Sequence, residues 1–113
     1  MKCWGANDYG QLGDGTTGDH LTPTVAPGFA GATSLATGER TTCTVGAGGT
    51  VWCAGSNALG QLGDGNGGNE QPGHVDVDAL SGLDVRSYAA GYYFGCATLG
   101  DGTVRCWGDN EDG

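Results

Sequence analysis

The five cysteines are the residues of this sequence whose spacing most directly suggests chemistry. Cys43 and Cys53 are ten residues apart, and so are Cys96 and Cys106. The midpoint of each pair falls in a glycine-rich turn, at position 48 or 101. If each turn closes a β-hairpin, the two cysteines face each other with Cα atoms ~4.5–5.5 Å apart, a separation that a disulfide accommodates. The pattern therefore predicts one cross-strand disulfide in each hairpin.

Buried free thiols and a zinc site are the alternatives to these disulfides. Structural zinc favours cysteines about two to four residues apart, often with paired histidines, and this spacing differs. We therefore predict no metal. Cys3 is equivalent to Cys53 in the repeat described below, so its expected partner falls ten residues upstream, before Met1. If the disulfides form, we expect the parent protein in an oxidising compartment such as the extracellular space.

The remaining chemistry-bearing residues do not form a catalytic set. His20 and His74 are the two histidines, and neither lies next to a serine or cysteine in a nucleophile motif. We expect both in exposed loops, and we expect no enzyme activity and no cofactor. A loop at 64–70 carries oxygen-bearing side chains, but their spacing does not match a known calcium loop. It is a candidate binding loop, with Asp64, Asn66, Asn69 and Glu70 as its residues.

The charge balance excludes several partners. Thirteen acidic residues against four basic ones give a net charge of −9. Nucleic-acid binding needs clusters of lysine and arginine, which this sequence lacks. No segment approaches the ~20 apolar residues that span a bilayer, and Met1 is not followed by a signal peptide. We therefore expect neither a nucleic-acid nor a membrane partner.

A repeat along the chain must position these residues. The segment CWGANDYGQLGDG begins at Cys3, CAGSNALGQLGDG at Cys53, and CWGDNEDG at Cys106. The starting cysteines are separated by 50 and then 53 residues. We infer two repeat units, 3–52 and 53–105, and a truncated third copy at 106–113. A period near ~50 residues is typical of propellers and solenoids.

Each unit reads as short β-strands. The runs 41–45 and 50–54 flank one glycine-rich turn, and 94–98 and 103–107 flank the other, which predicts two hairpins. Weaker strands are predicted near 24–26, 33–37, 75–77 and 84–89. About four strands per unit match one propeller blade.

The repeated motif resembles the regulator of chromosome condensation repeat. The shared pattern is C-W-G-x-N-x-x-G-Q-L-G-D-G, followed by proline, A-x-G, T-C and G-x-V-x-C-W-G. The resemblance implies an all-β fold in which the chain forms two four-stranded antiparallel blades of a seven-bladed type of propeller, which self-assembly could complete. The family often has a histidine two residues before its T-C core, whereas GERTTC and GYYFGC have none.

The G-Q-L-G segments are predicted to shape the corners of the blades. Their glycines allow positive φ or close backbone approach, and Asn7 and Asn57 could tie the turn by side-chain hydrogen bonds. The glutamines are expected to bond to the loop backbone and the leucines to fill the gap between blades. The residues are Gly10, Gln11, Leu12, Gly13, Gly60, Gln61, Leu62 and Gly63.

The function expected from this reading is a non-catalytic protein-interaction scaffold. Tyr92, Tyr93 and Phe94 have no aromatic counterpart in the other unit, which makes them candidate binding residues. We expect either head-to-tail association of copies, with three copies forming six blades and four forming eight, or inclusion in a longer chain. The alternative is guanine-nucleotide exchange on a small GTPase, which the best-known member of the family performs.

Overall fold

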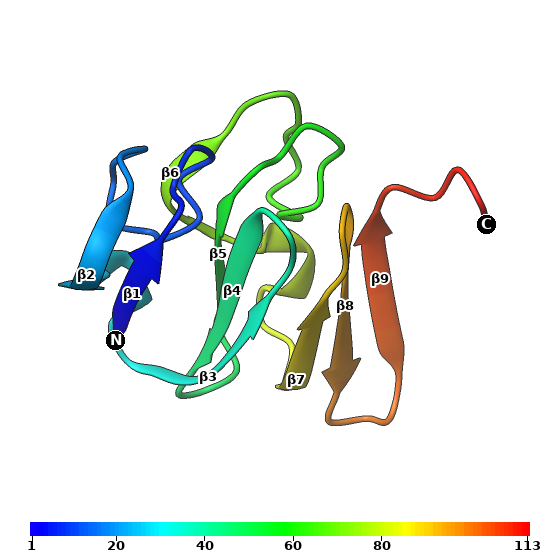
Figure 1. Cartoon of the computed structure of the whole chain (residues 1–113). Coiled ribbons are helices and arrows are strands. Elements are labelled where there is room, and N and C mark those ends of the chain that lie inside the picture. Colours follow the sequence, from blue (N-terminus) through cyan, green and yellow to red (C-terminus); the bar gives the residue numbers. More distant parts are fainter.

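The described residues of this computed structural model form an all-β molecule (Figure 1). They span residues 1–113, and only the side chain of Ala79 lies outside the description. The strands are β1 Lys2–Gly5, β2 His20–Val25, β3 Ala32–Thr37, β4 Thr41–Gly46, β5 Val51–Gly55, β6 Gln71–Asp76, β7 Val85–Ala90, β8 Phe94–Leu99 and β9 Val104–Gly108. Two short 3-10 helices follow β2 and β6, namely η1 Pro27–Phe29 and η2 Asp78–Leu80.

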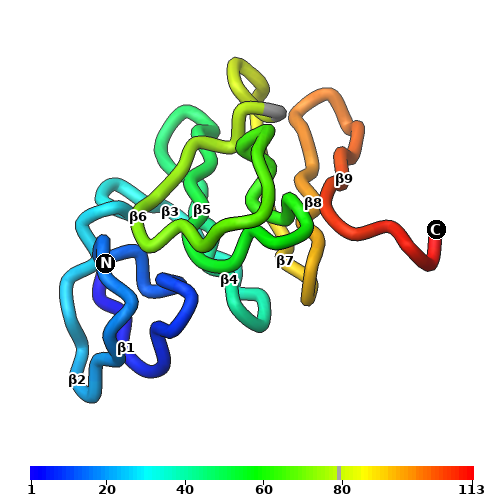
Figure 2. Tube along the Cα trace, turned by 90° about the horizontal axis from the view of Figure 1, so that it is seen from above, coloured from blue at the N-terminus to red at the C-terminus, as the bar shows by residue number. Residues whose placement is uncertain are grey.

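The strands form three antiparallel sheets that follow one another along the chain. The first pairs β1 with β2, the second has the order β3-β4-β5-β6, and the third has the order β7-β8-β9. The three sheets stand side by side in chain order, with the N-terminus beside the first and the C-terminus beyond the third (Figures 1 and 2). This arrangement is consistent with consecutive blades of a β-propeller.

The sheets are offset from the sequence repeats. The predicted boundary between residues 52 and 53 falls inside β5, and that between 105 and 106 falls inside β9. The second sheet therefore takes β3 and β4 from one repeat unit and most of its other two strands from the next. The all-β antiparallel prediction is confirmed, but the described chain contains one four-stranded sheet between two partial ones.

The two hairpins lie where they were predicted, as β4–β5 and β8–β9. The outer strands β2 and β6, however, begin about four residues earlier than the predictions near 24–26 and 75–77. Both contain a proline, Pro23 or Pro72, and proline lacks the N–H group that pairs strands. Each is the last strand of its sheet among the described residues, and an edge strand tolerates a residue without an N–H group.

The core lies between sheets rather than within them. One buried cluster joins the second and third sheets and includes Cys43, Cys53, Leu62, Val85 and Leu99. All six residues of β4 are buried, because a sheet packs against each of its faces. In β8, 53 residues later, buried residues alternate with partly or fully exposed ones. Interior packing of this kind requires a neighbouring sheet on both sides.

No helix among the described residues has the length and apolar character needed to cross a membrane.

Candidate protein-interaction surface

Two corner segments, residues 7–15 and 57–65, are built on a buried asparagine each. Asn57 Oδ1 accepts a hydrogen bond from Leu62 N at 3.1 Å, and Asn7 Oδ1 accepts one from Leu12 N at 2.9 Å. Both asparagines are at most 1% exposed. These bonds reach five residues along the chain, further than the local asparagine turn expected from the sequence. Each asparagine therefore holds a whole loop, rather than one turn, in place.

The glutamines and glycines of the corner segments complete this geometry. Gln61 Oε1 accepts a hydrogen bond from Leu59 N at 2.9 Å, and Gln11 does the same for Tyr9. Gly63 has φ of 72°, and a Cβ there would lie 2.5 Å from Trp107 Nε1. Only glycine therefore fits where the corner meets the next sheet. The other three G-Q-L-G glycines also have positive φ, namely Gly10, Gly13 and Gly60.

Equivalent positions at the two sheet junctions carry side chains of different sizes. At the first junction Phe29 of η1 packs with Ala54 of β5, and both are fully buried. At the second junction the equivalent residues are Leu80 of η2 and Trp107 of β9. A Cβ on Gly13 would meet the Phe29 ring, and a Cβ on Gly63 would meet the Trp107 indole, so the two aromatic rings fill equivalent places at the two junctions.

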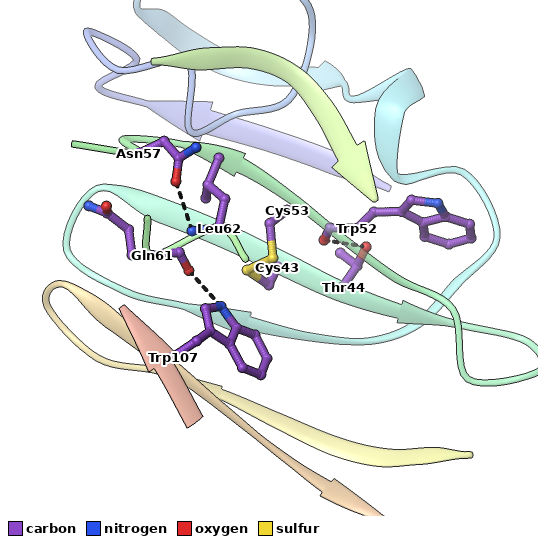
Figure 3. Close-up of a disulfide and its surroundings, with 8 residues drawn as sticks. All are labelled: Cys43, Thr44, Trp52, Cys53, Asn57, Gln61, Leu62 and Trp107. Atoms are coloured by element: carbon purple, nitrogen blue, oxygen red, sulfur yellow. Dashed lines mark hydrogen bonds between the residues drawn. A yellow bond between two sulfur atoms is a disulfide. The ribbon is translucent and has the colours of Figure 1, made fainter. Parts of the chain in front are cut away.

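The cysteines lie in the predicted cross-strand register. Cys43 pairs with Cys53, and Cys96 with Cys106, each with a Cα–Cα distance of 4.1 Å and the two sulfurs at bonding distance. The first pair is buried beneath the third sheet, near Leu62 and Trp107 (Figure 3). Cys106 is exposed. Cys3 is a free, half-buried thiol whose pKa is raised by burial.

Within the candidate loop 64–70, Asp64 forms hydrogen bonds that hold the corner segment together. Asp64 Oδ1 accepts hydrogen bonds from Asn57 Nδ2 and Asn66 N, both at 3.0 Å. Burial opposes its ionisation, but these bonds outweigh burial and lower the pKa of Asp64. Asn69 and Glu70 are exposed. No group of three or more metal-ligating side chains gathers among the residues that the structure describes.

His20 differs from its expected place in an exposed loop. It begins β2 and is partly buried, with Nε2 at 2.5 Å from Asp14 Oδ2. Asp14 also accepts hydrogen bonds from the backbone and hydroxyl of Thr16, and these contacts hold the pKa of Asp14 low despite its burial. The second corner has no equivalent histidine, so the repeat did not reveal this pair. His74 is exposed, as expected, but lies in strand β6.

The aromatic turn, residues 92–94, joins β7 to β8 and lies at the same end of the sheets as the corner segments (Figure 1). Tyr92 and Phe94 are 50% and 48% exposed, and the rings of Tyr92 and Tyr93 meet edge to face with centroids 4.2 Å apart. Beside them is a cleft of about 700 Å³ that is also lined by Trp107 and residues 108–113. Such an exposed aromatic group is a candidate contact surface for a protein.

The neighbouring β3–β4 turn adds residues that the sequence analysis missed. The carboxylate of Glu39 accepts a hydrogen bond from the Tyr92 hydroxyl, which together with Tyr93 raises the pKa of Tyr92 to about 12. The Arg40 guanidinium lies over the ring of Tyr9, with Cζ 4.5 Å from its centroid. Residues 39 and 40 occupy the same repeat positions as residues 92 and 93. This equivalence is the sequence feature from which they could have been identified.

Consecutive antiparallel sheets that pack face to face, with a glycine corner between β1 and β2 and another between β5 and β6, define a β-propeller repeat protein. The chain belongs to the regulator of chromosome condensation (RCC1) repeat family, whose models match residues 3–45 and 85–113.

Solved structures of this class superimpose on nearly the whole chain. Human WBSCR16 has a TM-score of 0.82 at 25% identity over 95% of this chain. Prp20p from Saccharomyces cerevisiae, described with its binding properties to Gsp1p and histones, has a TM-score of 0.82 at 27% identity over 97%. Yeast RCC1 (Prp20) bound to Kap60 gives 0.80 at 25% identity over 97%. The chain spans 28–29% of the length of these proteins. No curated protein matches it.

Proposed function

We propose that this chain is a non-catalytic interaction module that presents its aromatic turn to a protein partner. The observation that carries the proposal is the exposure of Tyr92 and Phe94 on a rigid turn. The turn is held from behind, because Tyr93 O accepts a hydrogen bond from Asp109 N at 3.0 Å. Aromatic side chains on a rigid support are frequent anchors of protein interfaces. The 64–70 loop is proposed as a second, polar part of the same surface.

The solved neighbours support a protein as the ligand class. One was studied for its binding to Gsp1p and histones and another is bound to Kap60. The scaffold of the turn is the shared fold, whereas the aromatic residues are particular to one of this chain's two repeat units. We therefore expect the aromatic turn, rather than the strands shared by both repeat units, to determine which partner binds.

The test compares two matched variants of the whole chain. A partner is first identified by cross-linking and mass spectrometry, and its Kd for the purified chain is then measured by calorimetry. Replacing Tyr92 and Phe94 by serine should weaken binding by about tenfold or more, since interface aromatics dominate affinity. Replacing Leu21, which is 94% exposed on β2, by serine should leave the Kd unchanged. Equal Kd values for both variants would refute the assignment of the surface.

Guanine-nucleotide exchange is the second candidate, and it follows from the family alone. It predicts that the chain accelerates release of a fluorescent nucleotide from a small GTPase. The exchange-factor reading fails if release proceeds at its intrinsic rate with the chain in excess.

We also propose that both disulfides form in an oxidising compartment. The support is that each cysteine pair lies in cross-strand register at bonding distance. Mass spectrometry of the intact chain without reductant tests this, because each disulfide removes two hydrogens from the mass. A fully reduced mass from the native source would contradict the proposal.

The open faces of the outer sheets are proposed to be covered by further blades, from other copies or from a longer polypeptide.

A further inference from the structure

Asn66 is the one asparagine of the sequence that is followed by glycine. In such a pair the glycine amide nitrogen can attack the side-chain carbonyl carbon of the asparagine, because glycine has no Cβ to hinder the approach. Asparagine is accordingly among the thermolabile residues of proteins. Asn66 and Gly67 lie in the candidate loop 64–70, outside any strand, and both are exposed. The pair is therefore accessible to water, which takes part in the reaction.

The nitrogen that would attack, Gly67 N, is free, although the groups around it are engaged. Asn66 N donates a hydrogen bond to Asp64 Oδ1 at 3.0 Å, and Asn66 O accepts one from Asn57 Nδ2 at 3.3 Å. On the other side, Gly68 N donates to Asn57 O at 3.0 Å. Among the described residues no acceptor lies in hydrogen-bonding position for Gly67 N. A Cβ on Gly67 would come no closer than 3.7 Å to its nearest neighbour, so the site is also uncrowded.

The side-chain amide of Asn66 is loosely held. Its Nδ2 donates to Asp64 O at 3.2 Å and to Asp64 Oδ2 at 3.4 Å, at or beyond the upper end of the usual range for such bonds. The asparagines that hold the corner segments differ, since Asn7 and Asn57 are at most 1% exposed. Asn57 Oδ1 is also bound by Leu62 N (Figure 3). Burial and hydrogen bonding protect those two amides, whereas the amide of Asn66 is exposed.

The first corner segment has the same bonds without the reactive pair. Thr16 N donates to Asp14 Oδ1 at 2.9 Å, and Thr16 O accepts from the buried asparagine of that corner at 3.0 Å. These are the main-chain bonds that Asn66 forms in the second corner. Thr16 and Thr17 therefore occupy the places of Asn66 and Gly67. Threonine at either place is compatible with the corner, which provides matched control variants.

We propose that Asn66 is a site of spontaneous deamidation, and that its conversion weakens the second corner segment. Hydroxide removes the proton of Gly67 N, and the nitrogen forms a bond to Asn66 Cγ. The bond from Cγ to Nδ2 breaks, and the leaving group takes a proton from water and departs as ammonia, which regenerates the hydroxide. Water then opens the succinimide ring. Opening at Cγ gives aspartate, whereas opening at the main-chain carbonyl gives isoaspartate, in which the chain continues through Cγ.

Either product changes the contacts of Asp64 and Asn57. The Asn66 amide donates to Asp64 Oδ2, whereas the product places a second carboxylate beside the first. In the isoaspartate form, the carbonyl that accepts from Asn57 Nδ2 also leaves the main chain and becomes part of that carboxylate. Asn57 holds the whole corner in place, so the loss of these contacts should make the corner less stable.

Timed incubation of the purified full chain at mildly alkaline pH tests the site, because hydroxide starts the reaction. Peptide mass spectrometry should show conversion at Asn66, with both products distinguished by their fragment ions, and no comparable conversion at the exposed Asn69. Gly67→Thr should slow the conversion several-fold, since its side chain hinders the attack. Retention of Asn66 in the folded chain, while the urea-unfolded chain converts, would overturn the assignment. So would equal rates at Asn66 and Asn69.

The effect on the corner is measured on the converted chain itself. Anion exchange separates it from the intact chain, because conversion adds a negative charge. The converted chain should unfold at a lower urea concentration, whereas Asn66→Thr, incubated alongside, should keep its unfolding midpoint. Equal midpoints for the intact and converted chains would refute the weakening of the corner. These measurements use the chain alone, so their outcome is independent of any partner of the aromatic turn.

Discussion

Trp107 Nε1 donates a hydrogen bond to the main-chain oxygen of Gln61, 3.2 Å away and 46 residues earlier in the chain. The bond ties β9 of the third sheet to the corner segment that follows β5 of the second. The indole also packs against the ring of Tyr88, with centroids 5.7 Å apart. Trp107 therefore connects the second and third sheets.

Replacing Trp107 by alanine should lower the free energy of unfolding by about 3 kcal/mol, because it removes both the bond and the packing. The equivalent Trp4 is 61% exposed, and its replacement by alanine should cost less than about 1 kcal/mol. Urea unfolding followed by circular dichroism measures both values. Similar losses would show that the junction does not depend on Trp107.

The different side-chain sizes at the sheet junctions predict a coupled pair of mutations. Ala54→Trp should destabilise the fold by about 3 kcal/mol, because the indole would overlap with Phe29. Phe29→Leu alone should also destabilise, since it leaves a cavity. The double variant recreates the combination found at Leu80 and Trp107. It should recover at least about 1 kcal/mol of coupling energy in a double-mutant cycle, and strict additivity would contradict the prediction.

Asn57 should contribute more to stability than its small size suggests. Asn57→Ala leaves the buried N–H of Leu62 without its acceptor and should cost about 2 kcal/mol. Asn69 lies in the neighbouring loop and is exposed, so Asn69→Ala should change stability by no more than about 0.5 kcal/mol. Thermal and urea unfolding of the two variants make the comparison. A small effect at Asn57 would mean that water satisfies the freed backbone group.

The lowered pKa of Asp64 makes the second corner sensitive to acid. Since its folded pKa lies below the ordinary value of 3.8, its stabilising effect is complete above that value. The effect is lost as the pH falls through the lower folded pKa. Asp64→Asn should therefore flatten the fall of stability below pH 3.8. Asp8→Asn alters an exposed carboxylate of the other corner and should leave the slope unchanged.

The two disulfides should differ in their accessibility to reductant. Cys43 and Cys53 are at most 1% exposed beneath the third sheet, whereas Cys106 is exposed. A water-soluble phosphine under native conditions should therefore reduce the Cys96–Cys106 bond first. Alkylation at timed intervals, followed by peptide mass spectrometry, gives the order. Simultaneous reduction would indicate that the second and third sheets separate readily.

Local sequence patterns determined the strands that form hairpins. The β-branched runs around the glycine turns fix β4–β5 and β8–β9, and the ten-residue spacing sets the cysteines opposite each other. Period and turn chemistry act over a few residues, so the sequence alone displays them. The outer strands were placed less well, because their pairing with a neighbour overrides the local signal of Pro23 and Pro72.

The sequence by itself therefore determined that the chain is a repeated β-structure with glycine corners, and it indicated the candidate aromatic residues. Only the tertiary structure decided what those elements meet. It brought Glu39 to Tyr92, paired His20 with Asp14, and placed Trp107 on the corner of the sheet before it. The first and third of these contacts join residues from different sheets, and their partners are selected by packing rather than by any spacing visible along the chain.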